Sequence, residues 1–428
     1  MKRVTVVLLL VVCMAAASFG FASASDYEPP PGVLSPDEVD FGGKTVTIVS
    51  SDFWKALPPE DRIAEAEEVF NVNIETLLID NADLMIARIM SGDSTYDIIQ
   101  QAHRVAYFPL VTAGMLLPAD DYLPEEFFDS LPSLDRYTIE KFKYNGKRYG
   151  IALHDGVVND SIMIISYNKD LIERYNQPDP YELYLSGEWT EEALEQIMIA
   201  VTQDTNGDGI VDQWGMPDIT NAAALIRWAP YNGAELAVQD ENGKWVFAYN
   251  RENAIHAINT VLRWKSMGII GNGSYVDGKV AFNATHLPGN RHAQAAGINF
   301  GLVPMPLGPH VDRHYYPAFE FFLTCLPANA AEPEKMIALA NFLFRKDDRL
   351  GFLDEIVTNW MVTKEHLDLF LTANDNWQAD GDIFQYTAVW DIASEALSQV
   401  LAGTKGAAAA MDEIAPRVQA ALDDLFKQ

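Results

Sequence analysis

One short segment of the chain carries side chains that could hold a metal ion. It is DTNGDGIVDQWG, and its candidate oxygen ligands are Asp204, Asn206, Asp208, Asp212 and the backbone carbonyl of Ile210. Their spacing matches the first nine positions of a calcium loop, with Gly209 at the sharp turn. Gly215 stands at the twelfth position, where such loops carry a bidentate Glu. We therefore predict a structural Ca²⁺ site here, with a solvated acidic turn as the alternative.

The elements before this loop indicate how the chain would position it. The run MIISYNKDLIERY predicts a strand that leads into a helix start, and WTEEALEQIMIAV predicts an amphipathic helix. On that helix, Leu194, Ile197 and Met198 share one face with Val201, which is the pattern of a helix packed on a core.

Strands and helices also alternate along the first part of the chain. We expect strands at 44–50, 72–79 and 96–101, and helices at 59–70, 82–90 and 105–114. This order is typical of α/β folds with a largely parallel sheet covered on both faces. Ligands of such sheets gather at the carboxyl ends of the strands. The loops at 51–54 and 102–104 are therefore the first places to look for a binding site.

The N-terminal region has the pattern of an export signal. Residues 1–24 contain Lys2 and Arg3, an apolar run and the small residues Ala22-Ser23-Ala24, which predicts a cleaved signal peptide and a periplasmic protein. Val11 and Val12 before Cys13 are poor matches to a lipidation site, so lipid anchoring is not expected. The Pro-rich, acidic residues 25–41 predict a flexible arm.

Composition excludes some classes of partner. The net charge of −31 and the lack of a basic stripe disfavour nucleic acid and anionic lipid as ligands. Removal of the leader would leave Cys325 as the only cysteine, so no intrachain disulfide is expected. A chain of 428 residues with 49% hydrophobic residues can build two large cores.

The order of several motifs resembles the family 1 extracellular solute-binding proteins of ABC importers, the family that includes sugar-binding receptors. The motifs are YNGKRYGIAL, YNKDL, the calcium-loop segment, INFGLVPMPLGP and the closing helices VWDIASEALSQVLAGTKGAAAAMDEIAPRVQAALDDL. The resemblance implies a periplasmic-binding-protein-like α/β fold, with two lobes joined by a hinge and a ligand cleft between them. It implies residues 42–155 plus 315–362 for lobe one, and residues 156–314 plus 363–428 for lobe two.

Aromatic side chains are the first candidates for contacts with a sugar, because a pyranose face stacks well on an electron-rich ring. The candidates are Trp54, Trp228, Trp377, Tyr386 and Trp390. Core packing is the alternative for Trp390, since Ala393 and Leu397 share its helical face.

Polar side chains would hold the sugar hydroxyl groups by charge-assisted hydrogen bonds. The candidates are Asp52, His103, Arg104, Asp155, Asn283 and His286. Asp52 resembles an acidic contact of the family in the loop after the first strand. For each of these residues, an ordinary loop position is the alternative.

The sequence predicts a receptor that binds a carbohydrate by hinge closure and delivers it to a membrane permease. We expect a monomer that performs no chemistry on its ligand and binds no nucleic acid. A ferric-ion receptor is the first alternative, because His310, Asp312, His314, Tyr315 and Tyr316 are residue types that bind iron. A periplasmic glycan hydrolase is the second, since a chain with 61 acidic residues always offers carboxylate pairs.

Overall fold

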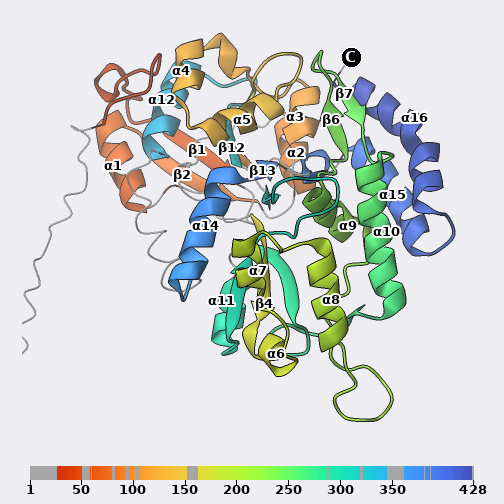
Figure 1. Ribbon diagram of the computed structural model, residues 1–428. Coiled ribbons are helices and arrows are strands. Elements are labelled where there is room, and N and C mark those ends of the chain that lie inside the picture. The colour runs from red at the N-terminus through yellow and green to blue at the C-terminus, as the bar shows by residue number, and fades with distance from the viewer. Residues whose placement is uncertain are drawn as a thin grey trace, which may run out of the picture.

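The computed structural model describes most of the chain, and Figure 1 draws the remaining residues as a grey trace. The described residues are 27–50, 58, 60–79, 82–92, 96–102, 107–151, 162–286, 289–318, 322–344, 361–379, 381–385 and 387–426. The predicted signal peptide lies outside them.

The first sheet lies in the upper half of Figure 1 and has the order β12-β3-β1-β2. Its strands are β1 (Thr45–Ser50), β2 (Asn73–Leu78), β3 (Ile98–Ala102) and β12 (Phe322–Cys325). β1 pairs in parallel with β2 and β3, while β12 pairs antiparallel with β3. Val46, Ile48 and Val49 are buried, as expected for a central strand whose two faces are both covered. The pairing of β12 with β3 places Phe322–Cys325, from late in the chain, in the first sheet.

Helices cover this sheet. They are α1 (Glu60–Phe70), α2 (Ala82–Met90), α3 (Phe108–Thr112), α4 (Glu125–Ser130), α5 (Ser133–Lys141) and α12 (Pro333–Leu343), with the 3-10 helices η2 (Pro36–Glu38) and η5 (Ala119–Asp121). α1 packs against α12: the Phe70 and Phe342 rings meet edge to face with centroids 5.1 Å apart, and buried Arg62 donates to the Phe342 carbonyl at 3.1 Å. Helix α12, from late in the chain, thus packs on the unit formed by the first strands and helices.

The second sheet differs from the sequence-based expectation. β4 (Met163–Asn168) lies between β9 (Phe282–His286) and β10 (Phe300–Val303), and both pairings are antiparallel. All six residues of β4 are buried. The prediction of a largely parallel sheet, made for the first part of the chain, is confirmed for β1, β2 and β3 but does not extend to this sheet. Alternation of strands and helices along the chain does not fix the direction of pairing, because long connections between strands allow either one.

Helices and small ladders surround the second sheet, most of them in the lower half and right side of Figure 1. The helices are α6 (Lys169–Arg174), α7 (Pro180–Ser186), α8 (Glu191–Val201), α9 (Ala222–Trp228), α10 (Glu252–Met267), α11 (Asn290–Ala295), α14 (Lys364–Asn376), α15 (Ala388–Leu401) and α16 (Ala407–Leu425), with η6 (Ala229–Asn232) and η9 (Gly381–Phe384). The ladders are parallel β5 (Met216–Pro217) with β8 (Ile270–Gly271), and antiparallel β6 (Ala237–Gln239) with β7 (Trp245–Phe247). In the part of the chain that the structure describes, no helix has both the length and the apolar composition needed to cross a membrane.

The amphipathic helix predicted before the cation loop is confirmed as α8. Its four predicted core residues are buried, and the Thr190 side chain caps its start by accepting from Ala193 N at 3.2 Å. Glu191 in its first turn is 2% exposed and accepts hydrogen bonds from Tyr231, His256, Thr260 and Arg263. Burial raises the pKa of Glu191, but the bonds from Tyr231 and His256 lower it more, so the carboxylate stays charged. This buried charge ties α8 to η6 and α10.

The predicted flexible arm at 25–41 is packed in the structure over its described residues, 27–41. Val33, Val39 and Phe41 are buried, and the Tyr27 ring meets Phe342 with centroids 5.2 Å apart. The apolar residues between the prolines account for this difference, since burying them against α1 and α12 offsets the entropy of ordering the segment.

Three segments meet where the chain passes between the sheets. β11 (Pro317–Ala318) pairs in parallel with β13 (Gln378–Ala379), and Ile162, just before β4, bridges to Ala318. The Gln378 side chain also accepts from Tyr316 N at 3.0 Å. The chain segment before β4 and the segment between β10 and β12 therefore lie side by side here.

His366 is a buried titratable group that ties α14 to the second sheet. Its Nε2 donates to the Phe300 carbonyl at 3.1 Å, and its ring stacks on Phe300 with centroids 4.7 Å apart. Nδ1 is buried and has no hydrogen-bond partner among the described residues. Burial and the nearby Lys169 lower the pKa of His366 to about 4.

This predicts loss of stability in mild acid. Between pH 6.5 and 4 the unfolded chain binds a proton at position 366 that the folded protein does not, so the free energy of unfolding falls as the pH falls. The loss attributable to this group is about 3 kcal/mol over that window. Urea unfolding at several pH values should show it, and His366→Phe should flatten the curve. His292→Gln, at an exposed position of α11, should leave the curve unchanged; equal slopes in wild type and His366→Phe would contradict the assignment.

Candidate functional site

The predicted ligand loops leave from adjacent strands of the first sheet. β1 ends at Ser50 and β3 ends at Ala102, and Ser50 pairs with Gln100. Because the two strands are parallel neighbours, the loops that follow them begin at the same sheet edge. Thr324 of β12 reaches this edge as well, since it accepts from Gln100 Nε2 at 2.7 Å.

Several predicted contacts fall on residues that the structure does not describe. They are Asp52, Trp54, His103, Arg104, Asp155 and Tyr386. Their roles stay predictions.

In the second sheet, Asn283 and His286 lie on β9 as half-buried residues. Asn283 pairs with Ser166 and His286 with Met163 on β4. Because side chains alternate along a strand, residues three positions apart face opposite sides of the sheet. The structure therefore does not bring these two side chains together on one face.

The predicted aromatic contacts differ in exposure. Trp228 is 2% exposed and packs against Trp264 and Tyr231, with centroids 5.5 and 5.3 Å away, so its position is that of a core residue. Trp377 is 7% exposed, and Trp390 is half-buried against the core. Core packing, which the sequence left as the alternative for Trp390, applies at least as strongly to Trp228.

The residues considered for iron are used in separate contacts. His310 lies beside Asn232, His314 Nδ1 donates to the Met305 carbonyl at 2.8 Å, and the Tyr316 hydroxyl is 3.4 Å from that of Tyr184. Among the described residues, no group of three or more His, Cys, Asp or Glu side chains is placed to hold a metal ion. The contacts of His310, His314 and Tyr316 also bring no two carboxylates together, so they do not support the second alternative, a glycan hydrolase.

The calcium-loop segment forms a compact turn on the surface. Asp204 accepts from the backbone N–H groups of Gly207 and Gly209 at 2.7 Å each, and both glycines have positive φ. Asp212 accepts from Thr205 N at 2.7 Å and lies 3.1 Å from Lys279 Nζ. The Thr205 bonds and Lys279 lower the pKa of Asp212 to about 2. Hydrogen bonds from the backbone likewise lower the pKa of Asp204, so the turn favours the ionised forms of these two side chains.

The structure explains why Gly215 replaces the usual twelfth-position Glu. A Cβ atom on Gly215 would lie 2.4 Å from the Cβ of Met198 on α8. The chain after the loop thus packs too closely on α8 for any side chain there. The oxygen ligands predicted from sequence fit a hard cation in type, but Asp204, Asp208 and Asp212 are not placed in the structure as a group that could hold a metal ion. Gly215 supplies no twelfth-position side chain, and the calcium site stays a prediction.

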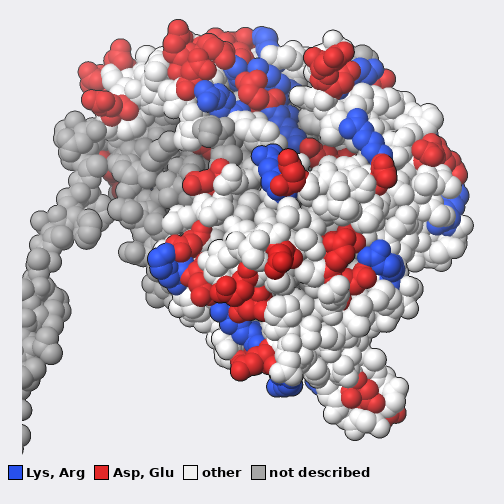
Figure 2. All heavy atoms as spheres, in the orientation of Figure 1, with Lys and Arg blue, Asp and Glu red and all other residues white. Residues whose placement is uncertain are grey.

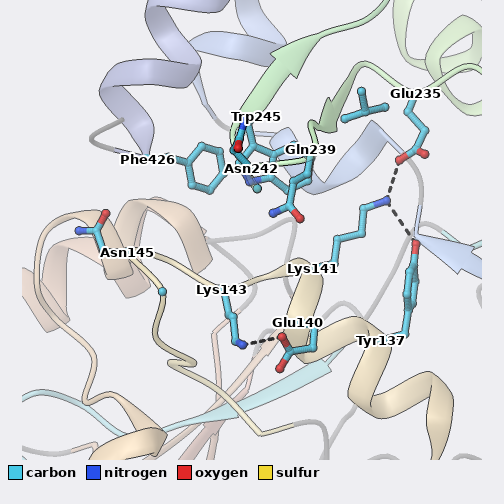
Figure 3. Close-up of a pocket in the computed structure, with 13 residues that line it drawn as sticks. Tyr137, Glu140, Lys141, Lys143, Asn145, Glu235, Gln239, Asn242, Trp245 and Phe426 are labelled. Atoms are coloured by element: carbon cyan, nitrogen blue, oxygen red, sulfur yellow. Dashed lines mark hydrogen bonds and ion pairs between the residues drawn. The ribbon is translucent and has the colours of Figure 1, made fainter.

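A groove of about 770 Å³ opens between α5 and the β6–β7 hairpin, which belong to different lobes (Figure 3). On one side, α5 and the turn after it contribute Tyr137, Glu140, Lys141, Lys143, Asn145 and Gly146. On the other side, the hairpin region contributes Glu235, Val238, Gln239, Asn242, Gly243 and Trp245, and the residue that follows α16 contributes Phe426. None of the predicted sugar contacts that the structure describes (Trp228, Asn283, His286, Trp377 and Trp390) lines it.

The charged side chains of the groove are paired with each other. Lys141 Nζ crosses the groove to Glu235, 2.7 Å from its carboxylate, and lies 3.4 Å from the Tyr137 hydroxyl (Figure 3). Burial lowers the pKa of Lys141, but Glu235 and Tyr137 raise it above the ordinary value, so the ammonium stays charged. Lys143 pairs instead with Glu140 on its own side, at 2.5 Å.

Aromatic rings from both lobes pack beside the groove. Phe108 of α3 lies 5.3 Å from Phe426 and 6.1 Å from Phe384, and Trp245 stacks on Phe426 with centroids 5.4 Å apart. These rings join α3 to η9, β7 and the residue that follows α16. Sequence reasoning missed both the groove and this cluster; the only local signal was Tyr137 and Lys141 sharing one face of a helix.

The structure is similar to solved binding proteins of ABC transporters. One is an ABC substrate-binding protein from Listeria monocytogenes in complex with cycloalternan, with a TM-score of 0.63, 15% identity, and 90% of this chain and 99% of that chain covered. Another is the sugar-binding protein MalE from Xanthomonas citri, with a TM-score of 0.65 and 15% identity, and with 90% of this chain and 99% of that chain covered. A third is the maltose/maltodextrin-binding domain MalE from Bdellovibrio bacteriovorus bound to maltotriose. Its TM-score is 0.59 and its identity 18%, and 90% of this chain and 100% of that chain are covered.

A scan against protein-family models found no match, and a search of the curated proteins found none. The structural similarity covers nearly the whole length of the three proteins above. It confirms the predicted fold class: the chain has the two-lobed, periplasmic-binding-protein-like α/β fold of ABC-transporter binding proteins.

Proposed function

We propose that the protein is an extracytoplasmic receptor that binds a carbohydrate between its two lobes and delivers it to an ABC importer. The observation that carries this proposal is the similarity of the whole fold to binding proteins whose structures contain cycloalternan or maltotriose. The protein would perform no chemistry on the ligand.

The arrangement of the first sheet supports a site between the lobes. The loops after β1 and β3 start at one sheet edge, and those loops contain Asp52, Trp54, His103 and Arg104. A tryptophan face and a set of carboxylate, imidazole and guanidinium groups suit a sugar, because the ring stacks and the hydroxyl groups take charge-assisted hydrogen bonds. Ligand contacts to both lobes would then favour the closed form.

The charge of the surface supports a neutral ligand in an exported protein. Figure 2 shows groups of Asp and Glu side chains over the visible face, with fewer Lys and Arg side chains between them. A net charge of −31 repels nucleic acid and anionic lipid, while an uncharged sugar is indifferent to it. The leader at residues 1–24 supports export, and the permease is the partner that this function requires.

A thermal-shift screen tests the proposal. We expect maltodextrins, other oligosaccharides or simple sugars to raise the melting temperature, since a ligand at 100 times its Kd stabilises a protein by about 2.7 kcal/mol. Amino acids should have no effect, and Trp54→Ala should abolish the shift while Glu241→Gln, on the exposed hairpin turn, retains it. Stabilisation by Fe³⁺ alone would contradict the proposal, and release of shorter glycans would identify a hydrolase.

We further propose that the loop at 204–212 binds Ca²⁺ as a structural ion. Asp204, Asp208 and Asp212 would supply carboxylate oxygens, Asn206 an amide oxygen and Ile210 its carbonyl, in the all-oxygen set that calcium prefers. The bound ion would neutralise the loop carboxylates and hold the turn against α8.

Calorimetric titration of the EDTA-treated protein with Ca²⁺ should give one binding event, and EDTA should lower the melting temperature whether or not sugar is present. Asp204→Asn should weaken binding at least tenfold. Asp240→Asn is the matched control, because Asp240 also accepts backbone N–H groups in a surface turn but lies outside the loop. If titration with Ca²⁺ releases or absorbs no heat, the loop is an ordinary acidic turn and the calcium proposal is wrong.

A further inference from the structure

The groove beside α5 contains one ion pair that joins the two lobes. Lys141 belongs to the first lobe: its helix ends where the Tyr107 hydroxyl donates to the Phe142 carbonyl, and the following chain bridges to β12 at Ile151. Glu235 belongs to the second lobe, because it follows η6, whose Tyr231 bonds to Glu191 of α8. The two residues are 94 positions apart in the chain.

The pair is partly removed from water on both sides. The Lys141 side chain is 11% exposed and that of Glu235 is 34% exposed. A charged pair at 2.7 Å in such surroundings interacts more strongly than an exposed pair, because less water screens its charges. A rotation of one lobe against the other that widened the groove would have to break this contact.

The position of α5 is itself fixed to its lobe. Arg148 is 4% exposed and forms ion pairs with Asp120, Glu125 and Glu140, of which Glu140 is on α5. Its guanidinium also lies over the Phe128 ring, 3.9 Å from the centroid. Lys141 therefore extends from a helix that cannot follow the other lobe without disturbing this cluster.

We infer that the Lys141–Glu235 pair is an interlobe latch that holds the groove in its narrow form and so biases the angle between the lobes. The groove shows no built ligand site, because its four charged side chains satisfy one another. Tyr137 adds a second contact beside this ion pair. It lies one turn before Lys141 on the same helical face, and its ring meets that of Trp377 beside the β11–β13 ladder, with centroids 6.3 Å apart. By linkage, a ligand that favours the same lobe angle as this ion pair binds more tightly when the pair is intact, and a ligand that favours another angle binds less tightly.

The test measures the lobe angle without any ligand, so it does not depend on the function proposed above. Spin labels at Glu126→Cys and Glu241→Cys, both exposed and on opposite lobes, report the distance across the groove by pulsed electron paramagnetic resonance. Cys325 is buried and should not label. Lys141→Met keeps the length of the side chain and its apolar packing but removes the charge.

We expect Lys141→Met and Glu235→Gln each to shift the distance distribution to longer values, and the double variant to shift it no further than either one. Lys143→Met is the matched control, because it breaks a pair within one lobe in the same groove, and it should leave the distribution unchanged. Circular dichroism establishes that each variant is folded. Distributions that coincide in wild type, Lys141→Met and Glu235→Gln would overturn the latch, as would additive shifts in the double variant.

Discussion

The short ladder between β11 and β13 is the constraint on which the arrangement of the lobes depends. Each sheet has a buried central strand, β1 in one and β4 in the other. The chain passes between them where Pro317 pairs with Gln378 and Ala318 pairs with both Ala379 and Ile162. A few backbone bonds at one place fix where the lobes join, but such a small ladder leaves the angle between them adjustable.

Contacts away from the ladder must then set that angle. On one side, aromatic rings from both lobes pack together and Lys141 reaches Glu235, so the lobes meet in both an apolar and a charged contact. The carboxyl ends of β1 and β3 form another edge, where a ligand could add contacts to both lobes. Under the proposed function, the equilibrium between open and closed forms would be a balance between contacts made within the protein and contacts made with a bound solute.

The sequence predicted features that depend on neighbours along the chain. The apolar face of α8 and the strand–helix rhythm of the first sheet are periodic signals, and both appear in the structure. Features that depend on distant partners were missed: the antiparallel pairing of β4, the packing of residues 27–41 on α12, and the contact between Lys141 and Glu235. Trp228 shows the limit for the site, because the residues around it do not reveal that it packs on Trp264, a tryptophan further along the chain.

Small-angle X-ray scattering of the mature protein, with and without the sugar that binds most tightly, tests the central claim most directly. Closure of two lobes on a ligand predicts a smaller radius of gyration and a shorter maximum dimension at saturation. Superimposable profiles from samples in which calorimetry shows the sugar to be bound would contradict hinge closure.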